Sequence, residues 1–164
     1  MRMSNRSPHD FSRTRVAVRL LAAVLVLFVG ADHYYEYAVD QYQVLPTIGS
    51  LFLVNFISAS AVGLALLLPL ERLFRRVGDT LTRLAAVSGF GIAATSLIAL
   101  LVSEQTPLFG FMELNYRPAI LVALSSEAAA AAAAAALFVM TLIASRSHGQ
   151  TPRLHVAGSS PAGA

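Results

Sequence analysis

The longest apolar run of the chain, residues 118–144, contains a single acidic residue, Glu127, which is followed by nine consecutive alanines. At ~1.5 Å per residue, a helix over this run is roughly 40 Å long, more than the ~30 Å hydrocarbon thickness of a bilayer. Glu127 then lies roughly 13 Å into the helix, near the middle of the membrane. An ionisable group at that depth is costly and usually turns inward toward a partner. We therefore expect the other segments to form a bundle around Glu127.

The composition of the chain also indicates an integral membrane protein. Of its 164 residues, 56% are hydrophobic and 13% are charged, whereas charged residues make up ~25% of a typical soluble domain. The absence of cysteine excludes thiolate catalysis, disulfide exchange, iron–sulfur clusters and Cys-ligated zinc. All twelve basic residues are arginines that lie beside apolar runs, so they indicate membrane orientation and no nucleic-acid partner.

Four apolar runs predict an all-α fold, a four-transmembrane-helix bundle. The membrane domain covers residues 16–144, with spans at about residues 16–35, 49–70, 81–103 and 118–144. Polar, basic residues 1–15 predict a disordered leader, and residues 145–164 predict a disordered tail. Between the second and third spans, apolar residues at helical spacing predict a short interfacial helix before Gly78.

The first span has two interpretations. A basic start, an apolar run and the small residues Val29-Gly30-Ala31 also fit a signal peptide with its cleavage site. The apolar character continues beyond that site through Tyr34 and Tyr35, as it does in a retained helix with an interfacial aromatic belt. We favour the retained helix and leave cleavage as the alternative.

The arginines predict the orientation of the bundle. Eleven of the twelve fall in the leader, the start of the first span, the loop at residues 71–83 or the tail, and only Arg117 falls on the other side. Basic residues resist translocation. We expect a multi-pass protein of the plasma membrane with both termini cytoplasmic.

Several motifs resemble those of a group of uncharacterised actinobacterial four-helix integral membrane proteins. The residues that carry the likeness are His33; Pro46, Ile48, Gly49, Leu51, Phe52 and Asn55; Phe109, Gly110, Phe111 and Glu113; and Glu127. The likeness covers about residues 15–145. It departs from the group's pattern after His33, where the sequence is more polar, and at Asn55, which is offset by one residue. The resemblance implies the fold and carries no activity.

Polar residues predicted to lie in the outer half of the bundle form the candidate site: Glu127, Asn55, His33 and Glu36, with Glu113 and Arg117 above them. One interpretation is a cavity in which Glu127 contacts a ligand or carries a proton. The other is a neutral Glu127 that bonds to Asn55 or Ser58 across helices and only holds them together. Arg117 is about 15 Å from Glu127 along the same helix, too far for a direct ion pair.

A metal site is a weaker possibility. His33, Glu36 and Asp40 have i, i+3, i+7 spacing, and Glu113 can join them from another loop, a donor set that suits Mn, Fe or Zn. No signature motif fixes such a geometry, so we favour a solvated acidic segment. We expect no metal, no cofactor and no catalytic residue.

For function, we favour a small non-enzymatic binding or accessory protein whose polar site takes a lipidic ligand or a partner subunit. The first alternative is an oligomeric proton-coupled transporter that uses Glu127, and the second is a metal-dependent membrane enzyme. The partners that fit these interpretations are membrane lipid, a second copy of the chain and a larger membrane complex.

Overall fold

The computed structural model describes residues 8–112 and 117–149, and it confirms an all-α bundle. Within these residues there is no strand. Four long helices are each long and apolar enough to cross a membrane. They are α1 (Pro8–Ala38), α2 (Pro46–Leu67), α4 (Gly78–Ser103) and α5 (Pro118–Gly149). Two short helices, η1 (Tyr42–Val44) and α3 (Leu70–Leu73), join α1 to α2 and α2 to α4.

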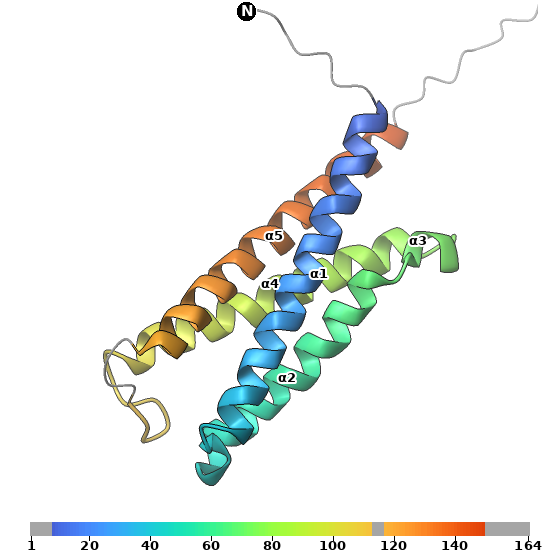
Figure 1. Cartoon of the computed structure of the whole chain (residues 1–164). Coiled ribbons are helices and arrows are strands. Elements are labelled where there is room, and N and C mark those ends of the chain that lie inside the picture. Colours follow the sequence, from blue (N-terminus) through green and yellow to red (C-terminus); the bar gives the residue numbers. More distant parts are fainter. Residues whose placement is uncertain (1–7, 113–116, 150–164) are drawn as a thin grey trace, which may run out of the picture.

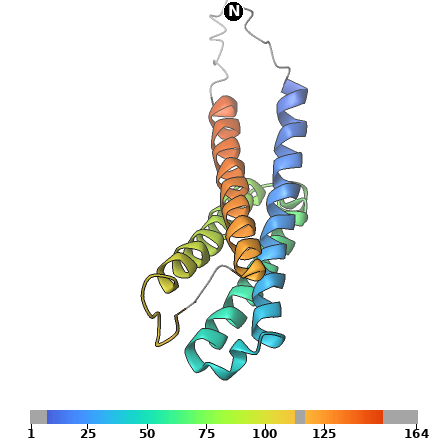
Figure 2. The same cartoon turned by 60° about the vertical axis from the view of Figure 1, so that its left-hand side comes forward.

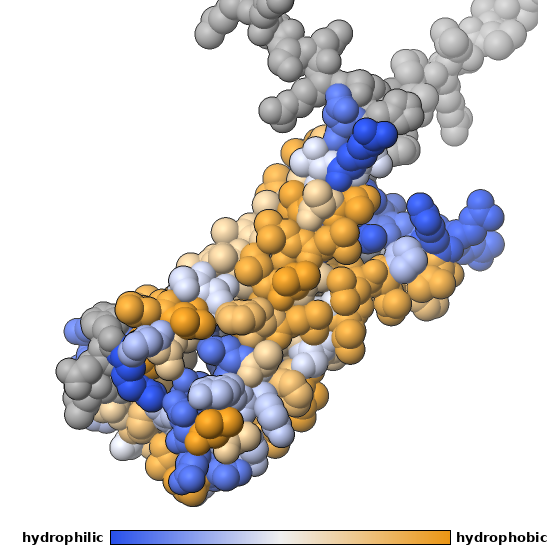
Figure 3. All heavy atoms as spheres, viewed as in Figure 1, coloured by the Kyte–Doolittle hydropathy of each residue, from blue (hydrophilic) through white to orange (hydrophobic). Residues whose placement is uncertain are grey.

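The long helices form two antiparallel pairs, α1 with α2 and α4 with α5 (Figure 1). Helix α5 also packs along α1, so the start of α1 and the end of α5 lie at the same end of the bundle (Figure 2). We call this the terminal end. The opposite end, where α1 turns into α2 and α4 into α5, is the loop end. Figure 3 shows hydrophilic residues at both ends and hydrophobic residues between them, the distribution that a membrane requires.

Helix α1 begins earlier than the sequence predicts. Residues 8–15 are helical, which corrects the expectation of a disordered leader there. The Thr14 hydroxyl donates to the Asp10 carbonyl at 2.8 Å, and the Arg15 guanidinium forms an ion pair with Glu71 at 3.4 Å. These partners stabilise the polar first turns because the charged side chains meet others across the bundle. The helix then continues without a break through residues 29–31 to Ala38.

The other helix ends differ from the predicted spans by a few residues. Helix α2 starts at Pro46, a position that a proline tolerates in the first turn, and it stops before Leu68, which is extended ahead of Pro69. Helix α4 begins three residues before the predicted span. Helix α5 continues to Gly149, so residues 145–149 are helical where a disordered tail was predicted. The rest of the predicted leader and tail, residues 1–7 and 150–164, lies outside the described residues.

Small residues bring the helices together. Ala22, Ala23 and Ala59 are fully buried between α1 and α2, and Ala130 and Ala134 of the alanine run are fully buried on α5. Ala85, Gly89 and Ala93, which lie one turn apart on α4, are also buried. In lipid, where there is little hydrophobic drive between helices, such close approach supplies the packing energy.

Gly63 gives the sharpest test of this packing. A Cβ atom added there lies 2.6 Å from Leu27 Cγ and 3.2 Å from the Ala23 carbonyl oxygen, both on α1. Gly63→Val should therefore push α1 and α2 apart and lower the free energy of unfolding by ~1–3 kcal/mol, the usual cost of overpacking. Gly91→Val is the matched control, because nothing lies within 4 Å of a Cβ at Gly91. Thermal unfolding of the two variants in detergent measures the difference, and equal losses would contradict this packing.

Candidate functional site

A cavity of about 440 Å³ lies between the two helix pairs at the loop end. Its walls come from α1, η1, α2, α4, α5 and the loop that follows α4. The surface at this end is hollowed among hydrophilic residues in Figure 3. Most of the lining is apolar, as in ligand pockets generally. The polar side chains on which the site depends are Asp32, His33, Glu36, Asn55, Ser96 and Glu127.

The structure brings four of the predicted site residues to this one cavity: His33 and Glu36 from α1, Asn55 from α2 and Glu127 from α5. Glu113 lies outside the described residues. Arg117 lies just before α5 and contacts residues of α1 and η1. Side chains from three helices that are far apart in the sequence therefore face the same space.

Glu127 is held at the cavity wall with almost no exposure. Its side chain is 3% exposed, and its Oε1 atom lies 3.7 Å from Nε2 of His33. The other carboxyl oxygen, Oε2, is buried and has no hydrogen-bond partner among the described residues. The predicted bond from Asn55 or Ser58 to Glu127 is not found there. A buried polar atom without a partner costs free energy, so Oε2 is a position where a donor would be stabilised.

His33 is oriented so that it can accept a proton from Glu127. Its Nδ1 atom lies 2.9 Å from the Val29 carbonyl oxygen, and a carbonyl only accepts, so Nδ1 carries the hydrogen. In the neutral ring, Nε2 is then the acceptor, and it faces Glu127. The Phe52 ring meets the imidazole edge-on at 5.3 Å and fixes its plane. The 3.7 Å between Glu127 Oε1 and His33 Nε2 is slightly longer than a hydrogen bond. A small shift of either side chain would bring the two atoms within hydrogen-bond distance.

Asn55 contributes a second buried acceptor to the cavity. Its Nδ2 group donates to the Ser96 hydroxyl on α4, which holds α2 and α4 together at this level. Its carbonyl oxygen, Oδ1, is buried and has no partner among the described residues. Two residues of the cavity lining, Glu127 and Asn55, therefore each carry a buried oxygen atom, Oε2 and Oδ1, that has no donor among the described residues.

Arg117 links the start of α5 to the end of α1 at the rim. It forms ion pairs with Asp40 at 3.2 Å and Glu36 at 3.6 Å, and it donates to the Tyr42 hydroxyl at 2.8 Å. These contacts neutralise the acidic groups nearest the loop end. The carboxyl groups deeper in the cavity, those of Asp32 and Glu127, have no arginine in the cavity lining beside them.

Sequence reasoning missed Asp32, which lines the cavity one residue before His33. It falls inside the predicted first span but was not among the candidate site residues, and it lies on α1, which runs to Ala38. Its i, i+4 spacing with Glu36 is the signal that places both carboxyl groups on one helix face. The predicted metal donors do not gather: within residues 8–112 and 117–149 no three His, Asp or Glu side chains form a metal-binding group.

Comparison with known proteins gives no relative. No protein-family model, curated protein or solved structure matches this chain. Many of the motif residues that carry the resemblance to the four-helix group lie at the loop-end cavity. His33, Ile48, Leu51, Phe52, Phe111 and Glu127 all line the cavity.

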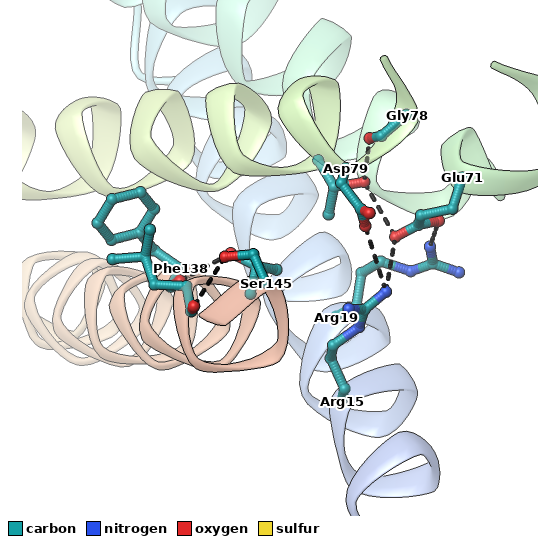
Figure 4. Close-up of polar contacts among 10 residues, drawn as sticks. Arg15, Arg19, Glu71, Gly78, Asp79, Phe138 and Ser145 are labelled. Atoms are coloured by element: carbon teal, nitrogen blue, oxygen red, sulfur yellow. Dashed lines mark hydrogen bonds and ion pairs between the residues drawn. The ribbon is translucent and has the colours of Figure 1, made fainter. Parts of the chain in front are cut away.

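A second polar cluster lies at the terminal end, and sequence analysis treated its arginines only as orientation signals. Arg19 pairs with Glu71 at 2.8 Å, Arg15 pairs with the same carboxylate at 3.4 Å, and the Thr82 hydroxyl donates to it at 3.1 Å. Figure 4 shows Arg15 and Arg19 extending from α1 toward Glu71, with Asp79 beside them. Burial alone raises the pKa of Glu71, but its hydrogen bonds and the two arginines outweigh burial and lower that pKa below its usual value.

Proposed function

We propose that this small membrane protein binds an amphipathic ligand in the loop-end cavity, with an apolar body and a cationic, hydrogen-bond-donating group such as a protonated amine. The observation that carries the proposal is the pair of buried oxygen atoms without donors, Oε2 of Glu127 and Oδ1 of Asn55. Both residues line a cavity whose other walls are mostly apolar. A small rotation of the two side chains would bring these oxygen atoms to a ligand N–H group that satisfies them, and no reaction on the ligand is required.

The charge of the cavity supports a cationic group. Its lining includes the carboxyl groups of Asp32, Glu36 and Glu127 and no arginine. Glu36 forms an ion pair with Arg117 at the rim. Carboxyl groups in surroundings of low dielectric constant attract a positive charge more strongly than they do in water, so an ammonium group is preferred over a neutral or anionic one.

The size of the cavity supports a ligand with a short apolar chain or ring. A volume of about 440 Å³ falls within the range of small-molecule sites. Leu51, Phe52 and Ile92 line it and offer aliphatic and aromatic contacts. We place this cavity on the outer side of the plasma membrane, with both termini cytoplasmic, and we assign the chain to the actinobacterial four-helix group that it resembles.

Octylamine, octanol and octanoate test the proposal because they share one chain length and differ in charge. We expect octylamine to raise the unfolding temperature of the protein in nanodiscs, octanol to raise it less and octanoate not to raise it. A ligand at 100 times its dissociation constant adds ~2.7 kcal/mol to the free energy of unfolding. Gly91→Leu is the matched variant, since Gly91 lines the cavity with open space beside it and a leucine there fills the site.

The comparison with Gly91→Leu separates binding in the cavity from general effects on the lipid. Stabilisation by octylamine that is lost in Gly91→Leu, in a variant that unfolds normally without ligand, supports the proposal. Equal responses of the two proteins, or equal responses to the three compounds, would refute it.

Proton-coupled transport is the second candidate, and one feature favours it. Titratable groups extend from the buried Glu127 to His33 and on to Glu36 and Asp40 at the rim, where Arg117 pairs with both carboxylates. Such a series can pass protons between the membrane interior and the loop end. A chain of this size would need several copies to enclose a transport path, which is consistent with an oligomer.

A further inference from the structure

A smaller pocket of about 200 Å³ lies at the terminal end, away from the loop-end cavity. Its lining comes from three helices: Arg15 of α1, Asp79 and Arg83 of α4, and Thr141, Ala144 and Ser145 of α5. We call it the terminal pocket. It borders the ion-pair cluster of Figure 4, where Arg15 extends from α1 toward Glu71 and Asp79. The mechanism proposed for the loop-end cavity does not use these residues.

The two arginines of the terminal pocket differ in how well they are paired. Arg15 is shared between Glu71 at 3.4 Å and the mostly exposed Asp79 at 3.7 Å. For Arg83 no hydrogen bond or ion pair occurs with any described residue, and its Nε atom is buried without a partner. With one carboxylate and two guanidinium groups in its lining, the pocket has a formal excess of one positive charge.

We propose that the terminal pocket binds the phosphate group of an anionic phospholipid, with Arg83 as its main contact and Arg15 as the second. A guanidinium group presents parallel N–H donors that match phosphate oxygens. Basic pockets between membrane helices commonly bind anionic lipid headgroups. The phosphate gives Arg83 the anion that it lacks, and Arg15 can contact it without leaving Glu71, because the contact with Asp79 is long.

The surroundings of the pocket favour a lipid as the source of the phosphate. Leu84 follows Arg83 on α4 and is 58% exposed, and Ile143 of α5, close to Ser145, is 50% exposed. These apolar side chains stand on the lipid-facing surface of the helices, where acyl chains can lie along them. A volume of about 200 Å³ holds a phosphate with its glycerol but leaves the acyl chains outside, against the helices.

Native mass spectrometry of the full chain in detergent tests the site, with phosphatidylglycerol, phosphatidylcholine and inorganic phosphate as probes. We expect phosphatidylglycerol to bind most tightly and Arg83→Gln to weaken it by roughly tenfold or more, the loss of one charged hydrogen-bonding contact. Arg76→Gln is the matched control, because it removes the same charge from an exposed arginine outside the pocket. If the arginines act only through nonspecific charge, the loss of one arginine lowers the affinity for phosphatidylglycerol roughly fivefold.

Ser145→Asp provides a second variant that does not depend on Arg83. It adds a carboxylate at an exposed residue of the pocket wall, so it should also weaken phosphatidylglycerol binding more than Arg76→Gln does. Equal affinities for Arg83→Gln, Ser145→Asp and Arg76→Gln would overturn the site. Inorganic phosphate that binds as tightly as phosphatidylglycerol would overturn the lipid source, and so would equal affinity for phosphatidylcholine.

Discussion

Glu127→Gln is expected to weaken octylamine binding by roughly 10- to 100-fold while leaving the bundle folded. Glutamine keeps the shape of the side chain, and its amide still offers an oxygen atom to the ligand. The charged hydrogen bond to the ligand is lost, and such bonds contribute ~1.5–3 kcal/mol. Octylamine titrations that follow the unfolding temperature measure the loss, with circular dichroism to confirm that the helices are intact.

Glu127→Ala distinguishes a ligand contact from a residue that only holds the helices together. Oε2 has no partner among the described residues, and Oε1 lies 3.7 Å from Nε2 of His33. We therefore expect alanine to abolish octylamine binding at little cost in stability. If Glu127→Gln binds octylamine normally and Glu127→Ala only unfolds more easily, the residue is a packing contact and the proposed site is wrong.

The same variants separate binding from transport. In proteoliposomes with a pH gradient, a transporter accumulates octylguanidinium, which keeps its N–H donors and stays protonated, so it does not cross the bilayer as a neutral base. Accumulation by the natural protein that requires the pH gradient, and that disappears in Glu127→Gln at concentrations that saturate its weaker binding, favours proton coupling through His33 and Glu127. If the protein binds the ligand but does not accumulate it, ligand binding without transport is its function.

Glu71→Gln is expected to lower the free energy of unfolding by ~2 kcal/mol. The Glu71 carboxylate joins α3 to Arg15 and Arg19 of α1. Without it Arg19 loses this ion pair, and Arg15 keeps only the 3.7 Å contact with the exposed Asp79. Breaking a fully buried pair costs ~3–5 kcal/mol and an exposed pair ~0–1 kcal/mol. Glu71 and Arg19 lie between these limits, with 23% and 13% of their side chains exposed. Chemical unfolding in detergent gives the difference.

The stabilisation by Glu71 should also depend on pH. Because the pKa of Glu71 is lower in the folded protein than its usual value of 4.5, the unfolded chain takes up its proton first as the pH falls. The contribution of Glu71 is therefore complete above about pH 4.5 and is lost as the pH falls through the lower folded value. Stability measured from pH 7 to pH 3 should decline in the natural protein, and Glu71→Gln should remove that part of the decline.

Asp79→Asn is the control for both measurements. Asp79 is 63% exposed and lies 3.7 Å from Arg15, so its loss should cost less than ~1 kcal/mol. A loss as large as that of Glu71→Gln would show that the cluster responds to total charge and not to the contacts of Glu71.

The helices of this protein could be predicted because lipid leaves few alternatives. A segment in the bilayer must satisfy its own backbone hydrogen bonds, so each apolar run of sufficient length becomes a helix. Small residues one turn apart, such as Ala59 and Gly63, then indicate where another backbone can approach, and both pack against α1. The same reasoning placed Glu127, Asn55 and His33 at similar depths and predicted that they could share a cavity.

Depth along a helix does not decide which side chain meets which, because that depends on how the helices are rotated and tilted against each other. Asn55 therefore bonds to Ser96 and not to Glu127, and Arg117 pairs with Glu36 of α1 and with Asp40, which follows α1. Helix ends also depended on distant partners: the start of α1 is stabilised by Glu71, 56 residues away from Arg15. The sequence by itself determined four membrane helices and their small-residue contacts. Only the tertiary structure decided that Oε2 of Glu127 is buried without a donor among the described residues, because the packing of the helices directs the Asn55 amide to Ser96 instead.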